Sequence, residues 1–225
     1  MTGSFSSFLN PAAVSDYVLE TPRKVPGLAD LHKMATLLLA EQAPSAADVL
    51  VVGAGGGLEI RAMAEMQPDW RFTGVDPSPA MLDIARQTTS LCAERTHFIH
   101  GTAIDAPAGL FDGAVCLLTL HFLDWRERLE TLQEIRWRLK PGGVFVAAHH
   151  TEIDGQAHLW LARSAIFAAG ATSLTGQASA SPKAMAKRLP LLSPDQEEMS
   201  FREAGFRQPS LFYAALSFRG WVMIA

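Results

Sequence analysis

Four glycines between positions 53 and 57 are the residues of this chain whose types and spacing first suggest chemistry. Glycine lets the backbone turn sharply, and it lets a ligand approach main-chain N–H groups with no Cβ in the way. Asp76 follows about twenty residues later, where a carboxylate can accept hydrogen bonds from the hydroxyls of a ribose. A glycine turn followed at this distance by an acid is typical of a nucleotide site.

A strand, a helix and a second strand must position these residues. Val49–Val52 is a short apolar run, rich in β-branched residues, of the kind found in strands covered on both faces. Leu58–Met66 predicts a helix whose free N–H groups and positive dipole end face the turn. Residues 70–76 predict a strand that ends at Asp76, which places its carboxylate beside the glycine turn.

The rest of the chain continues the alternation of strands and helices. Further strands are expected at Thr96–Gly101, Gly113–Leu120 and Gly143–His149. Helices are expected at Leu28–Ala43, Pro79–Thr89 (capped by Ser78), Trp125–Leu139, Gln156–Ala169, Pro182–Leu189 and Pro194–Ala204 (capped by Ser193). Two final strand-like runs joined at Arg219 and Gly220 must pair antiparallel. We therefore predict an α/β fold with a doubly wound, seven-stranded, mostly parallel sheet whose last strand is antiparallel.

Length and composition indicate one globular unit over residues 1–225, with 48% hydrophobic and 19% charged residues. Within it we expect residues 1–27 to form an N-terminal arm and residues 151–193 a helical insertion that covers the substrate. Trp160 lies in that cover, where it could line an apolar inner face over the acceptor or equally just pack the cover onto the sheet. The arm could equally be a lid or a loose terminus. The run RERLE at 126–130 predicts a solvated helix face.

Charge, cysteine content and hydropathy exclude several classes of protein. The net charge of −4 argues against a broad nucleic-acid surface, although a local patch for RNA stays open. Cys92 and Cys116 give no disulfide framework, and no apolar run approaches the ~20 residues of a membrane span. We expect a soluble, cytoplasmic protein with no membrane partner.

Histidines are the candidate acid–base residues. His121 follows the fourth expected strand, and His149 and His150 end the fifth, at the edge where open α/β sheets bind ligands. A neutral imidazole suits removal of a proton from an attacking hydroxyl or amine. We take His121 and His149 as candidate catalytic residues, while each could equally just bond backbone at a strand end. No histidine lies in a metal-ligand pattern, so no metal site is expected.

The order of these motifs resembles the class I S-adenosylmethionine-dependent methyltransferases. The motifs that carry the resemblance are VVGAGGG (51–57), GVDPSPAML (74–82), HGTAIDAP (100–107), LTLHFL (118–123), LKPGGVFV (139–146) and EAGF (203–206). The resemblance implies a Rossmann-like sheet, S-adenosyl-L-methionine as cofactor, and in-line transfer of its methyl group to an acceptor, for which a small molecule is expected. Within the family, PRKVPGLADLH and LTLHFL are similar to the enzymes that carboxymethylate a wobble uridine in tRNA, which makes tRNA the alternative acceptor.

The resemblance also implies the residues of the cofactor site. It assigns Gly53, Ala54, Gly55 and Gly57 to the methionine part and the ribose, Asp76 to the ribose hydroxyls, Pro77 and Met81 to the adenine, Thr102 and Ala103 to the adenine edge, and Leu117 and Leu118 to the sulfonium and methyl group. Val51 and Thr102 stand where many members carry an acid. Asp105 lies close enough to replace the second acid, or else it caps the next turn.

Two rival interpretations are weighed against an enzyme of this family. A nicotinamide-dependent oxidoreductase needs G-x-G-x-x-G, but Leu58 occupies the last position, and that class does not predict the closing hairpin. A catalytically degenerate cofactor-binding protein of the same fold would explain the missing acids at Val51 and Thr102. The intact glycine turn and Asp76 favour the enzyme.

Overall fold

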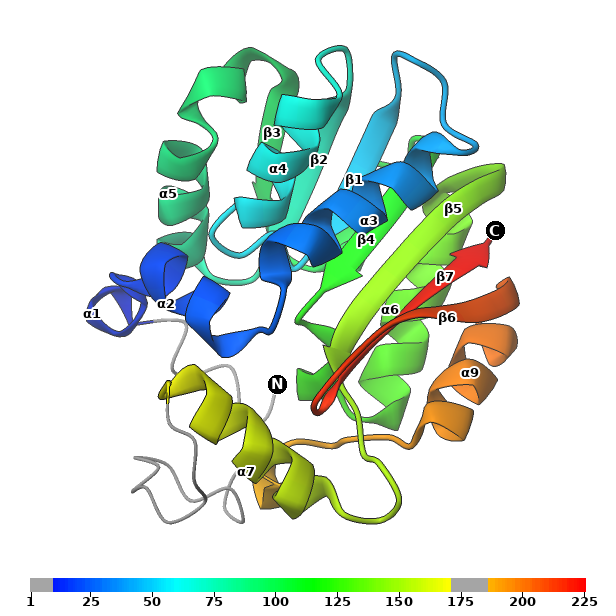
Figure 1. Ribbon diagram of the computed structural model, residues 1–225. Coiled ribbons are helices and arrows are strands. Elements are labelled where there is room, and N and C mark those ends of the chain that lie inside the picture. Colours follow the sequence, from blue (N-terminus) through cyan, green and yellow to red (C-terminus); the bar gives the residue numbers. More distant parts are fainter. Residues whose placement is uncertain (1–9, 171–185) are drawn as a thin grey trace.

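The computed structural model describes residues 10–170 and 186–225. Its strands form one sheet in the order β3-β2-β1-β4-β5-β7-β6 (Figure 1). The strands are β1 Asp48–Val52, β2 Arg71–Asp76, β3 Thr96–His100, β4 Phe111–Leu117, β5 Leu139–His150, β6 Arg207–Ala215 and β7 Phe218–Ile224. Neighbours from β3 to β5 pair parallel, and β7 pairs antiparallel with both β5 and β6. The predicted seven-stranded, mostly parallel sheet is confirmed.

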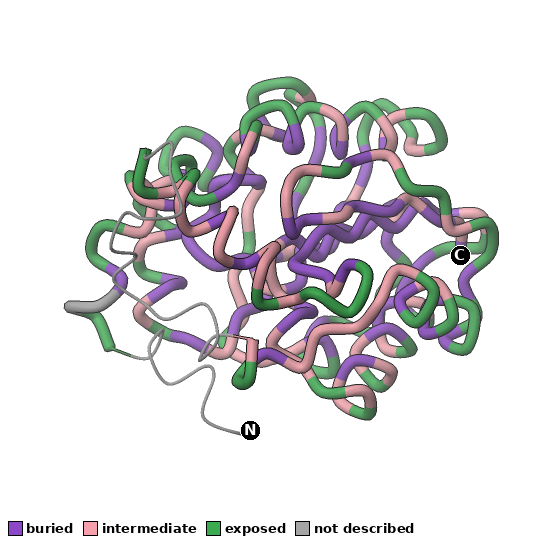
Figure 2. Tube along the Cα trace, turned by 60° about the horizontal axis from the view of Figure 1, so that its bottom comes forward, coloured by how far each residue is buried: buried purple, intermediate pink, exposed green. Residues whose placement is uncertain are grey.

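Helices cover both faces of this sheet. They are α1 Pro11–Val14, α2 Tyr17–Lys24, α3 Leu28–Ala40, α4 Leu58–Met66, α5 Pro79–Thr88, α6 Trp125–Arg138, α7 Ala157–Ala168 and α9 Pro194–Glu203. The sheet face that carries Val49 and Val51 packs against α3 and α4. The face that carries Leu50 and Val52 packs against α6 and α9. The central strands are buried along most of their length because they are covered on both sides (Figure 2), and their buried side chains are mainly apolar.

Local signals fix the helix ends that adjoin the sheet. The Ser78 hydroxyl accepts a hydrogen bond from the Met81 N–H at 3.2 Å, and Pro79 takes the first position of α5. Ser193 and Gln196 form a capping box at the start of α9. Both caps were predicted, so the ends of these helices follow from local sequence.

The closing hairpin turns at a different place from the predicted one. Ala215 pairs with Phe218, so the turn consists of Leu216 and Ser217, and the expected turn at Arg219–Gly220 is wrong. Gly220 lies inside β7, where an added Cβ would be 3.1 Å from the ring of Phe212. Glycine is needed there for the close approach of an aromatic side chain, and not for a turn.

Strand β5 and the covering segments also differ from expectation. β5 begins at Leu139 instead of Gly143, because Leu139 already pairs with Phe111 of β4. In the arm, α1 packs near α5 and α2 contacts α7, so the described part of the arm is a helical cover (Figure 1). The helix expected at 182–189 lies partly outside the described residues. Within the described residues, no helix is long and apolar enough to cross a membrane.

Candidate functional site

The glycine turn between β1 and α4 has a backbone that other residues adopt only with strain. Gly53, Gly55 and Gly57 have φ of +71°, +47° and +75°. The N–H groups of Gly53 and Ala54 both donate to the Val75 carbonyl, at 2.9 and 3.0 Å. A Cβ on Gly53 would lie 2.0 Å from the hydroxyl oxygen of Thr119. The turn is therefore clamped between the ends of β2 and β4.

Asp76, at the end of β2, holds the turn as well as facing it. Its Oδ2 accepts from the Gly55 N–H at 2.9 Å, and its Oδ1 accepts from the Ser78 N–H at 2.8 Å. Burial raises the pKa of this carboxyl, while the two backbone donors act to lower it. A carboxylate has about four lone-pair sites, so about two remain for ribose hydroxyls. Sequence reasoning predicted the ligand role and missed the structural one.

The residues assigned to the adenine lie around the ends of β2 and β3. Met81 is buried, and its terminal methyl lies 3.4 Å from where a Cβ of Gly55 would be. The N–H of Gly101 donates to the Asp76 carbonyl, which joins the two strand ends. Pro77 follows Asp76 directly, and its carbonyl lies 3.1 Å from a ring nitrogen of His100.

Thr102 and Ala103 continue this edge after β3. Asp105 Oδ2 accepts from the Thr102 N–H at 2.8 Å, and the pair forms a capping box around a short 3₁₀ turn that contains buried Ala103. Of the two interpretations of Asp105, the structure shows the cap. Its carboxylate already has a backbone partner, in the same way as that of Asp76.

Leu117 and Leu118 bring the end of β4 to the glycine turn. Leu117 is buried, and its carbonyl accepts from the hydroxyl of Thr119 at 3.1 Å. Leu118 has φ of +59°, an unusual conformation for a leucine, and its N–H donates to the Ala148 carbonyl of β5 at 2.6 Å. Strained backbone of this kind clusters at functional sites.

His121 and His150 meet at the ends of β4 and β5. Their ring centroids are 4.9 Å apart in an edge-to-face arrangement, and the His150 ring stacks on Phe218 at 3.9 Å. Burial lowers the pKa of His150 to about 3 and that of His121 well below its usual value. Both rings are therefore neutral at neutral pH. The Nδ1 of His121 is buried and has no hydrogen-bond partner among the described residues.

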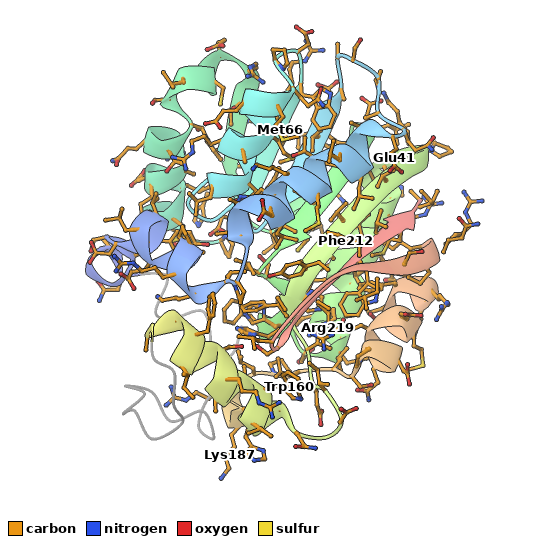
Figure 3. The ribbon with its side chains drawn as sticks, in the orientation of Figure 1. Glu41, Met66, Trp160, Lys187, Phe212 and Arg219 are labelled. Carbon is orange, nitrogen blue, oxygen red and sulfur yellow. The ribbon has the colours of Figure 1, made fainter. Side chains whose placement is uncertain are left out.

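Two serines connect His150 to the covering helix α7. The Nδ1 of His150 lies 2.7 Å from the Ser217 hydroxyl in the hairpin turn, and that oxygen lies 2.6 Å from the hydroxyl of Ser164. Leu161 and Ser164 are the buried residues of α7. Trp160, on the same helix (Figure 3), is half-buried, and the guanidinium of Arg163 lies 4.3 Å from the centre of its ring. The cover thus packs through Leu161 and Ser164.

His149 points to the opposite face of the sheet. Its Nε2 lies 2.9 Å from Oε1 of Glu197, and its ring lies beside Trp221. Glu197 also pairs with Arg128 of α6, and all three charged or titratable side chains are fully buried. Burial alone would raise the pKa of Glu197, but its interactions with His149 and Arg128 lower it. The prediction of a solvated face at 126–130 is wrong for Arg128, which also donates to the carbonyls of Leu120 and Pro190.

Tyr17 and Glu59 adjoin the glycine turn and were not found from the sequence. The ring of Tyr17 on α2 would be 2.7 Å from a Cβ on Gly56, so the arm packs directly on the turn. Glu59 is the second residue of α4 and is buried. An acid in the first helical turn after the glycines is a sequence signal that could have identified Glu59. Among the described residues, no group of histidine, cysteine or acidic side chains could hold a metal ion.

Known proteins share both the sequence motifs and the fold. Residues 49–143 match a family model described as a methyltransferase domain. A carboxy-S-adenosyl-L-methionine synthase from Campylobacter lari is 31% identical over 137 residues, 61% of this chain and 58% of that protein. The chain therefore aligns with somewhat more than half the length of this curated relative.

Solved structures extend the likeness to nearly the whole fold. An O-methyltransferase family protein from Burkholderia thailandensis has a TM-score of 0.71 at 16% identity, covering 97% of this chain and 61% of that one. Human N-acetylserotonin methyltransferase, solved with S-adenosylmethionine, has a TM-score of 0.59 at 17% identity, covering 94% of this chain and 58% of that one. At these identities the likeness concerns the fold. Residues 49–143, which carry the glycine turn and Asp76, thus match a methyltransferase domain, and the sheet has the fold of the class I S-adenosylmethionine-dependent methyltransferases.

Proposed function

We propose that this chain transfers a methyl group from S-adenosylmethionine to a small-molecule acceptor. The observation that carries the proposal is the clamped turn at Gly53–Gly57, whose Gly55 N–H is held by the buried Asp76 carboxylate. The N-terminus of α4 and a carboxylate with spare lone pairs together suit a ligand with an anionic amino-acid end and a ribose. The residues present therefore fit the cofactor.

The proposed contacts follow the expected assignment. The turn residues Gly53, Ala54, Gly55 and Gly57 would hold the methionine part, Asp76 the ribose, Pro77 and Met81 the adenine face, Thr102 and Ala103 its edge, and Leu117 and Leu118 the sulfonium. When bound, the cofactor supplies a methyl group on a positive sulfur that leaves as a neutral thioether. The protein has to align the acceptor and exclude water, because the donor already carries its activation.

His121 and His150 are proposed to orient the acceptor. Neutral rings suit a position near a sulfonium, since an imidazolium would be repelled by it. Imidazoles with such low pKa are weak bases, so they suit an acceptor whose proton is already acidic, such as a phenol or a carboxylic acid. His149 is buried against Glu197 on the opposite face of the sheet, and we assign it a supporting structural role there.

The cover favours a small acceptor over tRNA. Helices α2 and α7 contact each other across the edge where the strands end, and Tyr17 seals the glycine turn (Figure 1). A closed site of this kind excludes water and suits a compact substrate. The net charge of −4 also gives no general attraction to a polyanion.

Calorimetric titration of the purified chain tests the proposal. We expect S-adenosylmethionine and S-adenosylhomocysteine to bind and NADH not to bind. Asp76→Ala should weaken both by about tenfold or more through loss of charge-assisted hydrogen bonds, while Asp83→Ala, an exposed acid on α5, should not. Well-folded protein that binds neither adenosyl compound would refute the function and leave a degenerate protein of the same fold that binds some other partner.

The sequence relatives favour one second candidate. Their name states that they make carboxy-S-adenosyl-L-methionine, a small molecule derived from the cofactor itself. If this chain does the same, incubation with S-adenosylmethionine and a cell extract should yield an adenosyl compound heavier than the cofactor. Methyl transfer should instead yield S-adenosylhomocysteine, so mass spectrometry of the cofactor separates the two reactions.

A further inference from the structure

Glu59 is a buried acid beside the glycine turn. It is 8% exposed, and it belongs to α4, whose N-terminus faces the turn. Acids are almost never this buried unless they are paired. Among the described residues, no lysine, arginine or histidine forms an ion pair with Glu59, although ion pairs are present elsewhere on the same helix, such as Arg61 with Glu65.

The titratable groups that face Glu59 all favour its neutral form. They are Tyr17 on α2, Asp76 at the end of β2 and Cys116 on β4. Burial raises the pKa of Glu59 to about 8; its own backbone N–H opposes this, and Asp76 adds to it. The protein therefore places a carboxyl where negative charge is unfavourable without a positive partner.

The turn itself carries no charged group that could pair with an ammonium. The N–H groups of Gly53, Ala54, Gly55 and Gly57 are bonded within the protein, and the N-terminus of α4 carries partial positive charge. Asp76 already accepts two backbone hydrogen bonds. Val51, before the turn, is fully buried in β1 and has no polar atom to offer. Glu59 is the remaining carboxyl next to the turn.

We propose that Glu59 receives the ammonium group of the amino-acid end of the cofactor, and that it gives up its proton when the ligand binds. The inference rests on the proposed function. Binding then converts the carboxylic acid and the ligand ammonium into an ion pair and releases one proton to the solvent. A role confined to packing would leave the side chain protonated throughout.

A cycle of two proteins and two ligands tests this assignment. The ligands are S-adenosylhomocysteine and the same thioether with hydrogen in place of its amino group, and the proteins are the wild type and Glu59→Gln. Wild type should prefer the amino ligand by about tenfold or more, whereas Glu59→Gln should bind both within about threefold. Glu65→Gln, an exposed change on the same helix, should keep the wild-type preference.

Proton release gives a second readout that needs no variant. Calorimetry at pH 7 in two buffers of different ionisation enthalpy should show release of most of one proton with the amino ligand, and far less with the deaminated one. The preference for the amino ligand should grow from pH 6 to pH 8. Asp76 faces the ribose that both ligands share, so its titration cancels in this comparison.

The results separate the two claims. Wild-type protein that binds neither ligand refutes the proposed function. Wild-type protein that binds both ligands equally, or a Glu59→Gln variant that keeps the full preference, overturns the role of Glu59 alone. If Glu59→Gln does not fold, equal proton release with the two ligands on wild-type protein overturns it.

Discussion

Replacing Glu197 with glutamine removes the charge at the centre of the fully buried group formed with Arg128 and His149. The shape of the side chain is kept, but the Arg128 guanidinium then stays in the interior without an anionic partner. Breaking a buried ion pair in this way costs about 3–5 kcal/mol. Domains of this kind have a total free energy of unfolding of roughly 5–15 kcal/mol, so the loss is a large fraction of it.

The neighbouring residue provides the control. Glu198 pairs with Arg202 on the exposed side of the same helix, and Glu198→Gln should cost less than about 0.5 kcal/mol. Urea unfolding followed by circular dichroism measures both variants. With a slope of about 2–3 kcal/mol per molar urea, Glu197→Gln should lower the midpoint by roughly 1–2.5 M.

Two results would contradict this reasoning. A loss for Glu197→Gln as small as that for Glu198→Gln would mean that the buried charges are not coupled. The double change Arg128→Met with Glu197→Leu should recover most of the lost stability, because it removes both charges and refills the space with apolar atoms. Further destabilisation by the double change would show that the carbonyl contacts of Arg128, and not its charge, stabilise this region.

Gly53→Ala should destabilise the fold by roughly 2 kcal/mol or more, because its Cβ would meet Thr119 and its φ is +71°. Gly109 has open space around it, so Gly109→Ala should change stability by less than ~0.5 kcal/mol when both variants are unfolded by heat. His32 and His150 have pKa lowered by burial to about 4 and about 3, from an ordinary 6.5. Below pH 6.5 each ring is protonated in the unfolded chain but stays neutral in the folded protein. The stability that each histidine contributes above pH 6.5 is therefore lost as pH falls, and the loss in the free energy of unfolding is about 2 kcal/mol per histidine at pH 5. His32→Gln or His150→Asn should flatten the decline between pH 7 and pH 5, and an unchanged slope would refute the neutral assignment.

Much of the cofactor side follows from local sequence. The apolar run before Gly53, the glycines and the acid at the end of β2 are specified within thirty or so residues, and each follows a rule of backbone geometry. Such rules depend little on distant parts of the chain. The hairpin was predicted for the same reason, and its turn was misplaced because Gly220 serves packing in β7 and not a turn.

The acceptor side depends on contacts between distant segments. Which face His149 and His150 take is set by the register of β5 against β7, and a shift of one residue would exchange them. Arg128 lies in a run of charged residues and is buried only because Glu197, 69 residues away, lies opposite. Tyr17 reaches the glycine turn through the placement of the arm. Composition and hydrophobic periodicity do not indicate which distant residues pair.

The Ser217 turn has a consequence for the order in which the molecule is completed during synthesis. The strands β1 and β2, which frame the glycine turn and Asp76, are translated before residue 77. Ser217, which bonds His150 and Ser164, is supplied by the hairpin of β6 and β7, 67 residues after His150. The residues of the cofactor cradle are therefore translated well before those that complete the acceptor site, and only the insertion of β7 beside β5 joins the two.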